Sequence, residues 1–216
     1  MKYKRNKFNY FHKKETNTSL PISINGKKTI FLIFGLFLLL FPRYAAFEAQ
    51  YIATDSYIQQ AFIYMFFISN QTLGIIHESG HGVCYILPCP QFIMVINGTL
   101  FQLAFPLGVA YYYKQKGNLF ATYIALFFLG FSLQYTAWYI STAHEGLHLP
   151  AHKSFLGVDG YHDFNYLLDT LGLLAYNSFI SGLTKLVAYC LMIWAIVRMF
   201  FDAFRSKEIT NQSLGD

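Results

Sequence analysis

The stretch TIFLIFGLFLLLF, residues 29–41, has no polar side chain after its first threonine. Similar apolar runs recur along the chain, which is 55% hydrophobic and only 12% charged. A soluble domain carries about 25% charged residues, and a helix that crosses a bilayer needs about 20 mainly apolar ones. The sequence therefore predicts an all-α integral membrane protein, and its 216 residues allow one membrane domain with short tails.

Basic residues gather before this first apolar run. A Lys/Arg-rich segment beside a membrane helix is typical of the cytoplasmic side, so we expect residues 1–28 to form a basic cytoplasmic tail. The tail holds eight of the 16 lysine and arginine residues behind the net charge of +5, and it favours no nucleic-acid partner. It is also too long for the first region of a signal peptide, which favours an uncleaved first span. The basic residues are Lys2, Lys4, Arg5, Lys7, Lys13, Lys14, Lys27 and Lys28.

The membrane domain is expected over residues 29–204, followed by a polar C-terminal tail at 205–216. We predict about five to six transmembrane helices, including one long helix that Pro88 and Pro90 end. The run QFIMVIN, residues 91–97, suits either a short membrane-embedded strand or re-entrant segment, or the start of the next helix. The apolar segments are 29–47, 61–87, 100–113, 119–139 and 179–201.

These segments also predict an orientation. With the N-terminus inside, the helix at 61–87 returns toward the cytoplasmic face, and the loop at 144–162 reaches the same face. The side of the C-terminus stays open, because the span count places it outside whereas Arg198, Arg205 and Lys207 favour the inside.

The three cysteines are too few and too poorly spaced for a zinc ribbon. We interpret Cys84, Cys89 and Cys190 as free thiols that pack as small hydrophobic side chains. A Cys84–Cys89 disulfide is the alternative, although the sequence does not indicate it.

The long helix carries His77-Glu78-Ser79-Gly80-His81, which has H-E-x-x-H spacing. Positions i and i+4 share one helix face, so both imidazoles can reach one Zn²⁺ ion, and Glu78 can act as general base on its water. The alternative is a set of polar residues near a membrane surface. Ionisable side chains in an apolar helix are costly unless they are paired or bind a metal, which favours the metal site. The nearby glycines, Gly80 included, suit close approach of another helix or a substrate.

A catalytic zinc ion usually has three protein ligands, so a third is needed. The segment at 141–174 is rich in candidates. His144 and His148 are also i and i+4 if helical, and would then allow a second metal site; a solvated polar loop is the alternative. The candidates are His144, Glu145, His148, His152, Asp159, His162, Asp163 and Asp169.

H-E-x-G-H late in a membrane helix, followed by a strand-like segment and a later aspartate, resembles the site-2 protease family of intramembrane zinc metalloproteases. In that family the third ligand is an aspartate in N-x-x-P-x-x-x-x-D-G. This chain has Pro150 and Asp159-Gly160, but eight residues separate the proline from the aspartate and the asparagine is missing.

Two other segments, YHDFNYLLDTLGLL at 161–174 and NGTLFQLAFPL at 97–107, are similar to those of a small, poorly characterised bacterial branch of this family. This resemblance implies a multi-pass protein of the bacterial inner membrane with Asp163 as the third ligand. From the residues alone, an N-cap role for Asp163 and ligand roles for Asp159 or His162 stay open. Asn97 and Gln102 suit either substrate binding or hydrogen bonds between helices.

We therefore expect an intramembrane zinc metalloendopeptidase that cleaves membrane-protein substrates in the bilayer, with His77, His81 and Asp163 as ligands and Glu78 as catalytic base. A substrate strand would pair near residues 92–96. The alternatives are a non-proteolytic membrane metal-binding protein, such as a transporter or sensor, and an inactive protease homologue. The sequence specifies neither the substrate and its cleavage site nor the oligomeric state.

Overall fold

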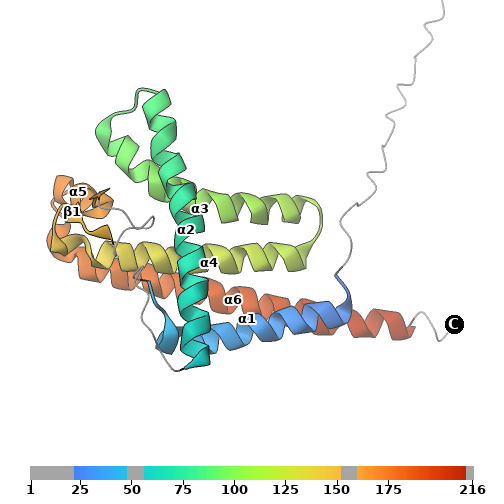
Figure 1. The fold of residues 1–216 in the computed structure, drawn as a ribbon. Coiled ribbons are helices and arrows are strands. Elements are labelled where there is room, and N and C mark those ends of the chain that lie inside the picture. Colours follow the sequence, from blue (N-terminus) through green and yellow to red (C-terminus); the bar gives the residue numbers. More distant parts are fainter. Residues whose placement is uncertain (1–21, 48–55, 152–159, 213–216) are drawn as a thin grey trace, which may run out of the picture.

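The computed structural model describes residues 22–47, 56–151 and 160–212 (Figure 1). Helices dominate this part of the chain, and the one sheet in it is a pair of two-residue antiparallel strands. The expected all-α class is confirmed. The helices are α1 (Ile24–Tyr44), α2 (Tyr57–Ile86), α3 (Gln91–Gln115), α4 (Leu119–Ser141), α5 (Asp163–Thr170) and α6 (Asn177–Gln212), with 3-10 turns η1 (Ala143–Glu145) and η3 (Leu174–Tyr176) and strands β1 (His148–Leu149) and β2 (Gly160–Tyr161).

Four of the described helices are long and apolar enough to cross a membrane, namely α1, α3, α4 and α6. This supports a multi-pass membrane protein, but with four candidate spans in place of the expected five to six. The long helix α2 is not among them, because polar residues such as Asn70, His77 and Glu78 interrupt its apolar sequence. Residues 91–97 form no strand: α3 begins at Gln91, directly after Pro90, where a missing amide hydrogen costs nothing.

The most buried of the four apolar helices is α4, which packs against α3 and α6. Gly130 of α4 allows α4 and α6 to approach each other closely, since a Cβ at this position would lie 2.6 Å from the Met192 side chain of α6. Aromatic rings fill the space between α4, α1 and α2; Phe41, Phe66 and Tyr135 are almost fully buried. The bundle therefore has its core on α4, and the other three apolar helices keep large exposed hydrophobic faces, as lipid contact requires.

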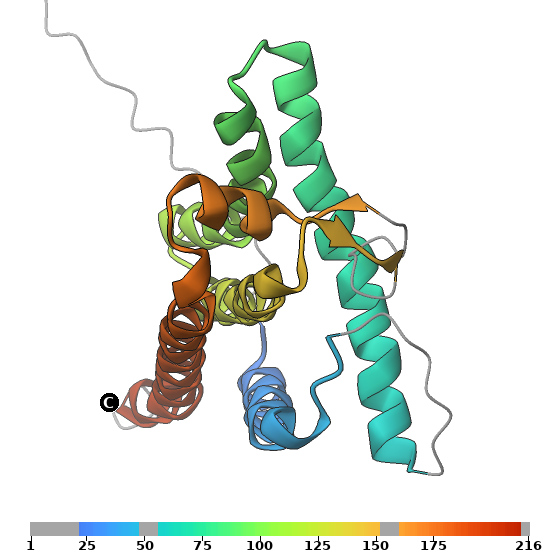
Figure 2. The ribbon, with the colours of Figure 1, turned by 90° about the vertical axis from the view of Figure 1, so that its left-hand side faces the viewer.

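Helix α2 crosses α1, α4 and α6 instead of running beside them, whereas the first part of α3 runs back along the last part of α2 (Figure 1 and Figure 2). Figure 2 views α1, α4 and α6 nearly along their axes, whereas α2 extends across the view. Its first half packs aromatic residues on α1, with the Phe62 and Phe37 rings stacked 5.6 Å apart. Its second half packs on α3. Because α2 does not run from one end of the bundle to the other, it does not carry the chain back across the membrane as the sequence interpretation assumed.

Both ends of the described chain lie at one end of the bundle (Figure 1). Near the start of α1, Lys27 forms an ion pair with Asp202 of α6 at 2.6 Å and lies over the Phe120 ring of α4. Helix α5 lies at the opposite end, beside Tyr139 of α4. Phe120 and Tyr139 are about 28 Å apart at 1.5 Å per helical residue, which is close to the thickness of a hydrocarbon core.

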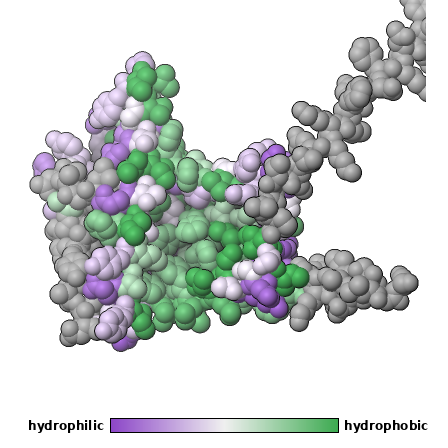
Figure 3. All heavy atoms as spheres, turned by 45° about the vertical axis from the view of Figure 1, so that its right-hand side comes forward, coloured by the Kyte–Doolittle hydropathy of each residue, from purple (hydrophilic) through white to green (hydrophobic). Residues whose placement is uncertain are grey.

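Helices α1, α3, α4 and α6 lead the chain alternately toward one end of the bundle and the other, so the start of α1 and the end of α6 share an end (Figure 1). Hydrophobic side chains cover much of the surface in Figure 3, with hydrophilic residues toward the two ends of the bundle. The histidine-rich segment was expected on the same side as the N-terminus. Its described part lies at the other end instead, because α2 lies across the bundle (Figure 1).

A disulfide joins Cys84, in the last turn of α2, to Cys89, just before α3. The interpretation of these two residues as free thiols is therefore wrong. The turn between α2 and α3 contains Pro88 and brings the two Cα atoms to 5.2 Å, within the range that a disulfide requires. Cys190 is free, as expected.

Candidate metal centre

The histidines of the H-E-x-x-H segment lie on one face of α2, as their spacing predicts. The His77 and His81 rings are 4.8 Å apart; His77 is buried, and His81 is partly buried. Glu78 is exposed, and one carboxylate oxygen of Glu78 and one nitrogen of each ring lie within 4.8 Å of one another. His77, Glu78 and His81 can therefore hold a metal ion together.

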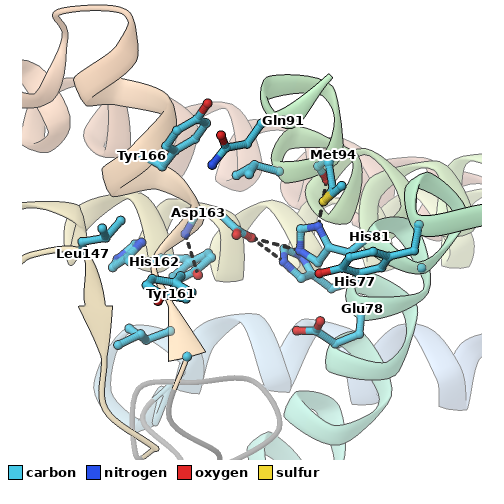
Figure 4. Close-up of a pocket in the computed structure, with 16 residues that line it drawn as sticks. His77, Glu78, His81, Gln91, Met94, Leu147, Tyr161, His162, Asp163 and Tyr166 are labelled. Atoms are coloured by element: carbon cyan, nitrogen blue, oxygen red, sulfur yellow. Dashed lines mark hydrogen bonds and ion pairs between the residues drawn. The ribbon is translucent and has the colours of Figure 1, made fainter. Parts of the chain in front are cut away.

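Asp163 reaches this pair from α5, 86 residues further along the chain (Figure 4). Its Oδ2 atom lies 2.7 Å from His77 Nε2 and 3.3 Å from His81 Nε2. Burial on its own raises the pKa of Asp163, but hydrogen bonds and charge attraction with the two histidines outweigh burial and bring the pKa below its ordinary value. The carboxylate is thus negatively charged at neutral pH beside two imidazole nitrogens.

The N-cap of α5 is His162, not Asp163. The His162 ring accepts a hydrogen bond from the Asn165 amide at 3.4 Å, and the Asp163 amide donates to the Tyr139 hydroxyl at 3.1 Å. The Asp163 side chain is therefore not needed as a cap and faces the histidines.

The other ring nitrogen of each histidine faces an acceptor. His77 Nδ1 lies 3.3 Å from Gln102 Oε1, and His81 Nδ1 lies 2.8 Å from the Met94 carbonyl. The amide nitrogen of Gln102 donates to the Ser132 hydroxyl at 3.1 Å, which leaves Gln102 Oε1 toward His77.

Without a metal ion, His81 is protonated at neutral pH: burial lowers its pKa, but the hydrogen bond and charge attraction to Asp163 outweigh burial and raise the pKa to about 9. With an ion at the site both histidine rings must be neutral, and this network then places their protons on Nδ1. Two Nε2 lone pairs and a carboxylate then converge on one point, an arrangement that a cation stabilises.

Replacement of Gln102 by leucine tests this orientation. Loss of the acceptor frees the His77 ring, so we expect zinc affinity to fall about 10- to 100-fold, as removal of such supporting groups does. Competition with a chromogenic zinc chelator measures the affinity. The control is Asn97→Leu, which removes a 2.6 Å hydrogen bond to the Gly80 carbonyl between the same two helices. An equal loss in both variants would assign the effect to helix packing instead of ring orientation.

A close approach of α2 and α3 brings the histidines against the α3 backbone. A Cβ at Gly98 would lie 2.7 Å from His77 Nε2 and 2.6 Å from His81 Nε2. On the facing helix, Gly80 packs directly on the Asn97 backbone, so a Cβ there would also clash. The expected close approach at Gly80 is confirmed, whereas Gly82 has open space around it.

A cavity of about 730 Å³ opens beside these residues. Figure 4 shows Glu78, His77, His81 and Asp163 around it, with Tyr161 and Tyr166 on the α5 side. The segment that forms β1 and β2 supplies further lining, including Leu147 and Leu149. The site can therefore receive a sizeable, partly apolar molecule directly beside the Glu78 carboxylate.

Other candidates from the sequence do not join the pair. His162 stacks on the Tyr139 ring at 4.3 Å and bonds to the Thr142 hydroxyl at 3.0 Å. Burial lowers the pKa of His162 to about 4, so the ring is neutral and supports the turn before Asp163.

His144 bonds to the Ser141 carbonyl, and His148 pairs with Tyr161 in the sheet. Neither belongs to a group of three converging metal-binding side chains within the described residues. His152 and Asp159 lie outside the described residues. Asn97 and Gln102 both form hydrogen bonds between helices, which was one of the two roles considered for them.

Two supporting groups were not anticipated from the sequence: the Met94 carbonyl and the Tyr139 hydroxyl. A main-chain carbonyl leaves no trace in a sequence, and a tyrosine in an apolar run looks like core.

Comparisons of the chain with protein-family models, with curated proteins and with solved structures find no match.

Proposed function

We propose that this protein is an intramembrane zinc metalloendopeptidase, resembling the site-2 proteases, in which His77, His81 and Asp163 hold the metal and Glu78 is the general base. One observation carries the proposal. Both Nε2 atoms converge on Asp163 Oδ2, at 2.7 and 3.3 Å, while both Nδ1 atoms face acceptors.

This donor set suits zinc, which binds two neutral imidazoles and a carboxylate and keeps a fourth position for the reaction. When bound there, a zinc ion supplies a Lewis acid and lowers the pKa of a water molecule toward about 7. The residues also discriminate against hard cations such as Mg²⁺ and Ca²⁺, which prefer oxygen ligands.

The chain supplies the remaining chemistry. Glu78 takes a proton from the attacking water and gives it to the leaving amine, a role for which its place on the cavity lining suits it. Gln102 and the Met94 carbonyl keep the imidazoles in one tautomer. Residues 92–96 are helical and offer no strand edge, so the extended backbone of β1 and β2 is the better candidate to align an unwound substrate.

A second function has support from one observation. The Glu78 carboxylate belongs to the same group of converging atoms as the two histidines, so Glu78 can itself be a metal ligand. The protein would then be a metal transporter or sensor, or an inactive protease homologue, with no free base for hydrolysis.

Replacement of Glu78 by glutamine separates these functions. If Glu78 is the base, the variant keeps about one zinc ion per chain but loses peptide cleavage by about 10²- to 10⁴-fold. Zinc is measured by elemental analysis, and cleavage by mass spectrometry on a library of transmembrane peptides in detergent. The control is Glu145→Gln, an exposed carboxylate that does not line the cavity.

Two outcomes would contradict the proposed peptidase function. Loss of zinc from the Glu78→Gln variant would make Glu78 a ligand. Unchanged cleavage by the variant would remove Glu78 from the reaction.

A further inference from the structure

The two ends of the helix bundle differ in charge. Of the 16 lysine and arginine residues in the chain, 13 belong by sequence to the end where α1 starts and α6 finishes. They precede Thr29, lie at the end of α3, or lie in the last part of α6. The three that do not are Arg43, Lys153 and Lys185. An excess of basic residues marks the cytoplasmic side of membrane helices, and all three loops and tails at this end agree.

The disulfide lies toward the other end. Helix α3 begins just after Cys89 and ends at the Lys114–Lys116 segment; its first part runs beside α2, and its last part turns and runs beside α4 to the basic end (Figure 1). The Cys84–Cys89 bond therefore lies at the opposite end of α3 from the Lys114–Lys116 segment, in the α2–α3 corner toward the end that carries α5 (Figure 1). Disulfides form and persist in oxidising compartments and are rare in the cytosol. This observation is independent of the charge distribution, and both give the same orientation.

The disulfide also belongs to the corner of α2 and α3 that carries the candidate metal centre. Three residues before Cys84, His81 bonds through Nδ1 to the Met94 carbonyl, five residues after Cys89. Asn97 of α3 donates to the Gly80 carbonyl of α2 at 2.6 Å. The bond thus ties together the two segments that position His81.

We propose that the centre formed by His77, His81 and Asp163 opens on the extracytoplasmic, oxidising side of the membrane, where the Cys84–Cys89 disulfide closes the α2–α3 corner. The orientation stands without any assigned activity. Its consequence for substrates rests on the proposed peptidase function: the peptide bonds cleaved are those of membrane-protein segments at the extracytoplasmic boundary, not those that reach the cytoplasm.

Single cysteines at the two ends test the orientation. In a Cys190→Ala background, Tyr176→Cys introduces a thiol at the end that carries α5, where Tyr176 is 60% exposed. Gln115→Cys introduces one at the exposed end of α3 beside Lys114 and Lys116. A membrane-impermeant maleimide is added to spheroplasts that produce each variant. We expect Tyr176→Cys to react at once and Gln115→Cys to react only after the membrane is opened. The reverse pattern, or equal reaction of both, would overturn the proposal.

The redox state is tested on the unaltered chain. Membranes are denatured and treated with a high-mass maleimide before and after reduction with dithiothreitol. We expect one mass shift, from Cys190, before reduction and three after it. Three shifts without reduction would place the α2–α3 corner in a reducing compartment and overturn the proposal. Neither test uses peptide cleavage, so failure here and failure of the proposed activity are distinguishable.

Discussion

Replacement of Asp163 by alanine is expected to weaken zinc binding by more than about 100-fold. Loss of a supporting group beyond the ligands already costs 10- to 100-fold, and Asp163 is proposed as a ligand itself. Its carboxylate also lies within 3.3 Å of both imidazoles. A competition titration against a chromogenic chelator measures the loss, and peptide cleavage should disappear with it.

The Asp163→Ala variant should fold. His162 caps α5, and the amide of residue 163 keeps its hydrogen bond to Tyr139, so the helix itself loses only a favourable charge at its start, worth about 0.3–1 kcal/mol. The two histidines also lose their contacts with the carboxylate. The control is Asp169→Ala, which removes an exposed carboxylate from the last turn of the same helix. If both variants bind zinc as the unaltered chain does, the third ligand lies elsewhere, with Asp159 the next candidate.

Replacement of Gly98 by alanine should have an effect of similar size without removing any ligand. The added methyl group would lie 2.6 Å from His81 Nε2 and 2.7 Å from His77 Nε2, much closer than van der Waals contact permits. The α3 backbone cannot retreat easily, because Asn97 is held against Gly80 by packing and a hydrogen bond. The rings must therefore turn away, and zinc binding and cleavage should both be lost.

Gly108→Ala is the matched control for this substitution. It lies on the same helix, and a Cβ there would meet no atom within 4 Å, so zinc affinity should not change. Both variants gain the helix preference of alanine over glycine, about 1 kcal/mol, so thermal unfolding should separate a local clash from a general effect. Undiminished zinc affinity in Gly98→Ala would mean that the two Nε2 atoms do not face the ion.

The local part of the site could be predicted from the sequence. The i, i+4 spacing of His77 and His81 alone places both rings on one helix face, and the structure has them there. Asp163 is different, because nothing local in the sequence links two residues 86 positions apart. It was expected from a resemblance between segments, and its contact with the histidines depends on how α5 docks against α4.

The arrangement of the helices was predicted less well. Hydropathy identifies apolar segments but not the direction in which each one runs, so the course of α2 across the bundle was missed. Its polar residues, among them Asn70, were the available signal. The β-branched and aromatic residues at 91–97 suited a strand, but helix packing against α2 decides their conformation. The disulfide depends on the tight turn around Pro88, which the spacing of two cysteines alone does not establish.

X-ray absorption at the zinc edge of the purified, zinc-loaded protein tests the central claim most directly. The account predicts a ligand shell with two imidazole nitrogens at about 2.0–2.1 Å and a carboxylate oxygen at about 2.0–2.2 Å, and loss of that oxygen in Asp163→Ala. A shell with fewer than two imidazoles or with sulfur, or a purified protein that retains no zinc, would contradict it.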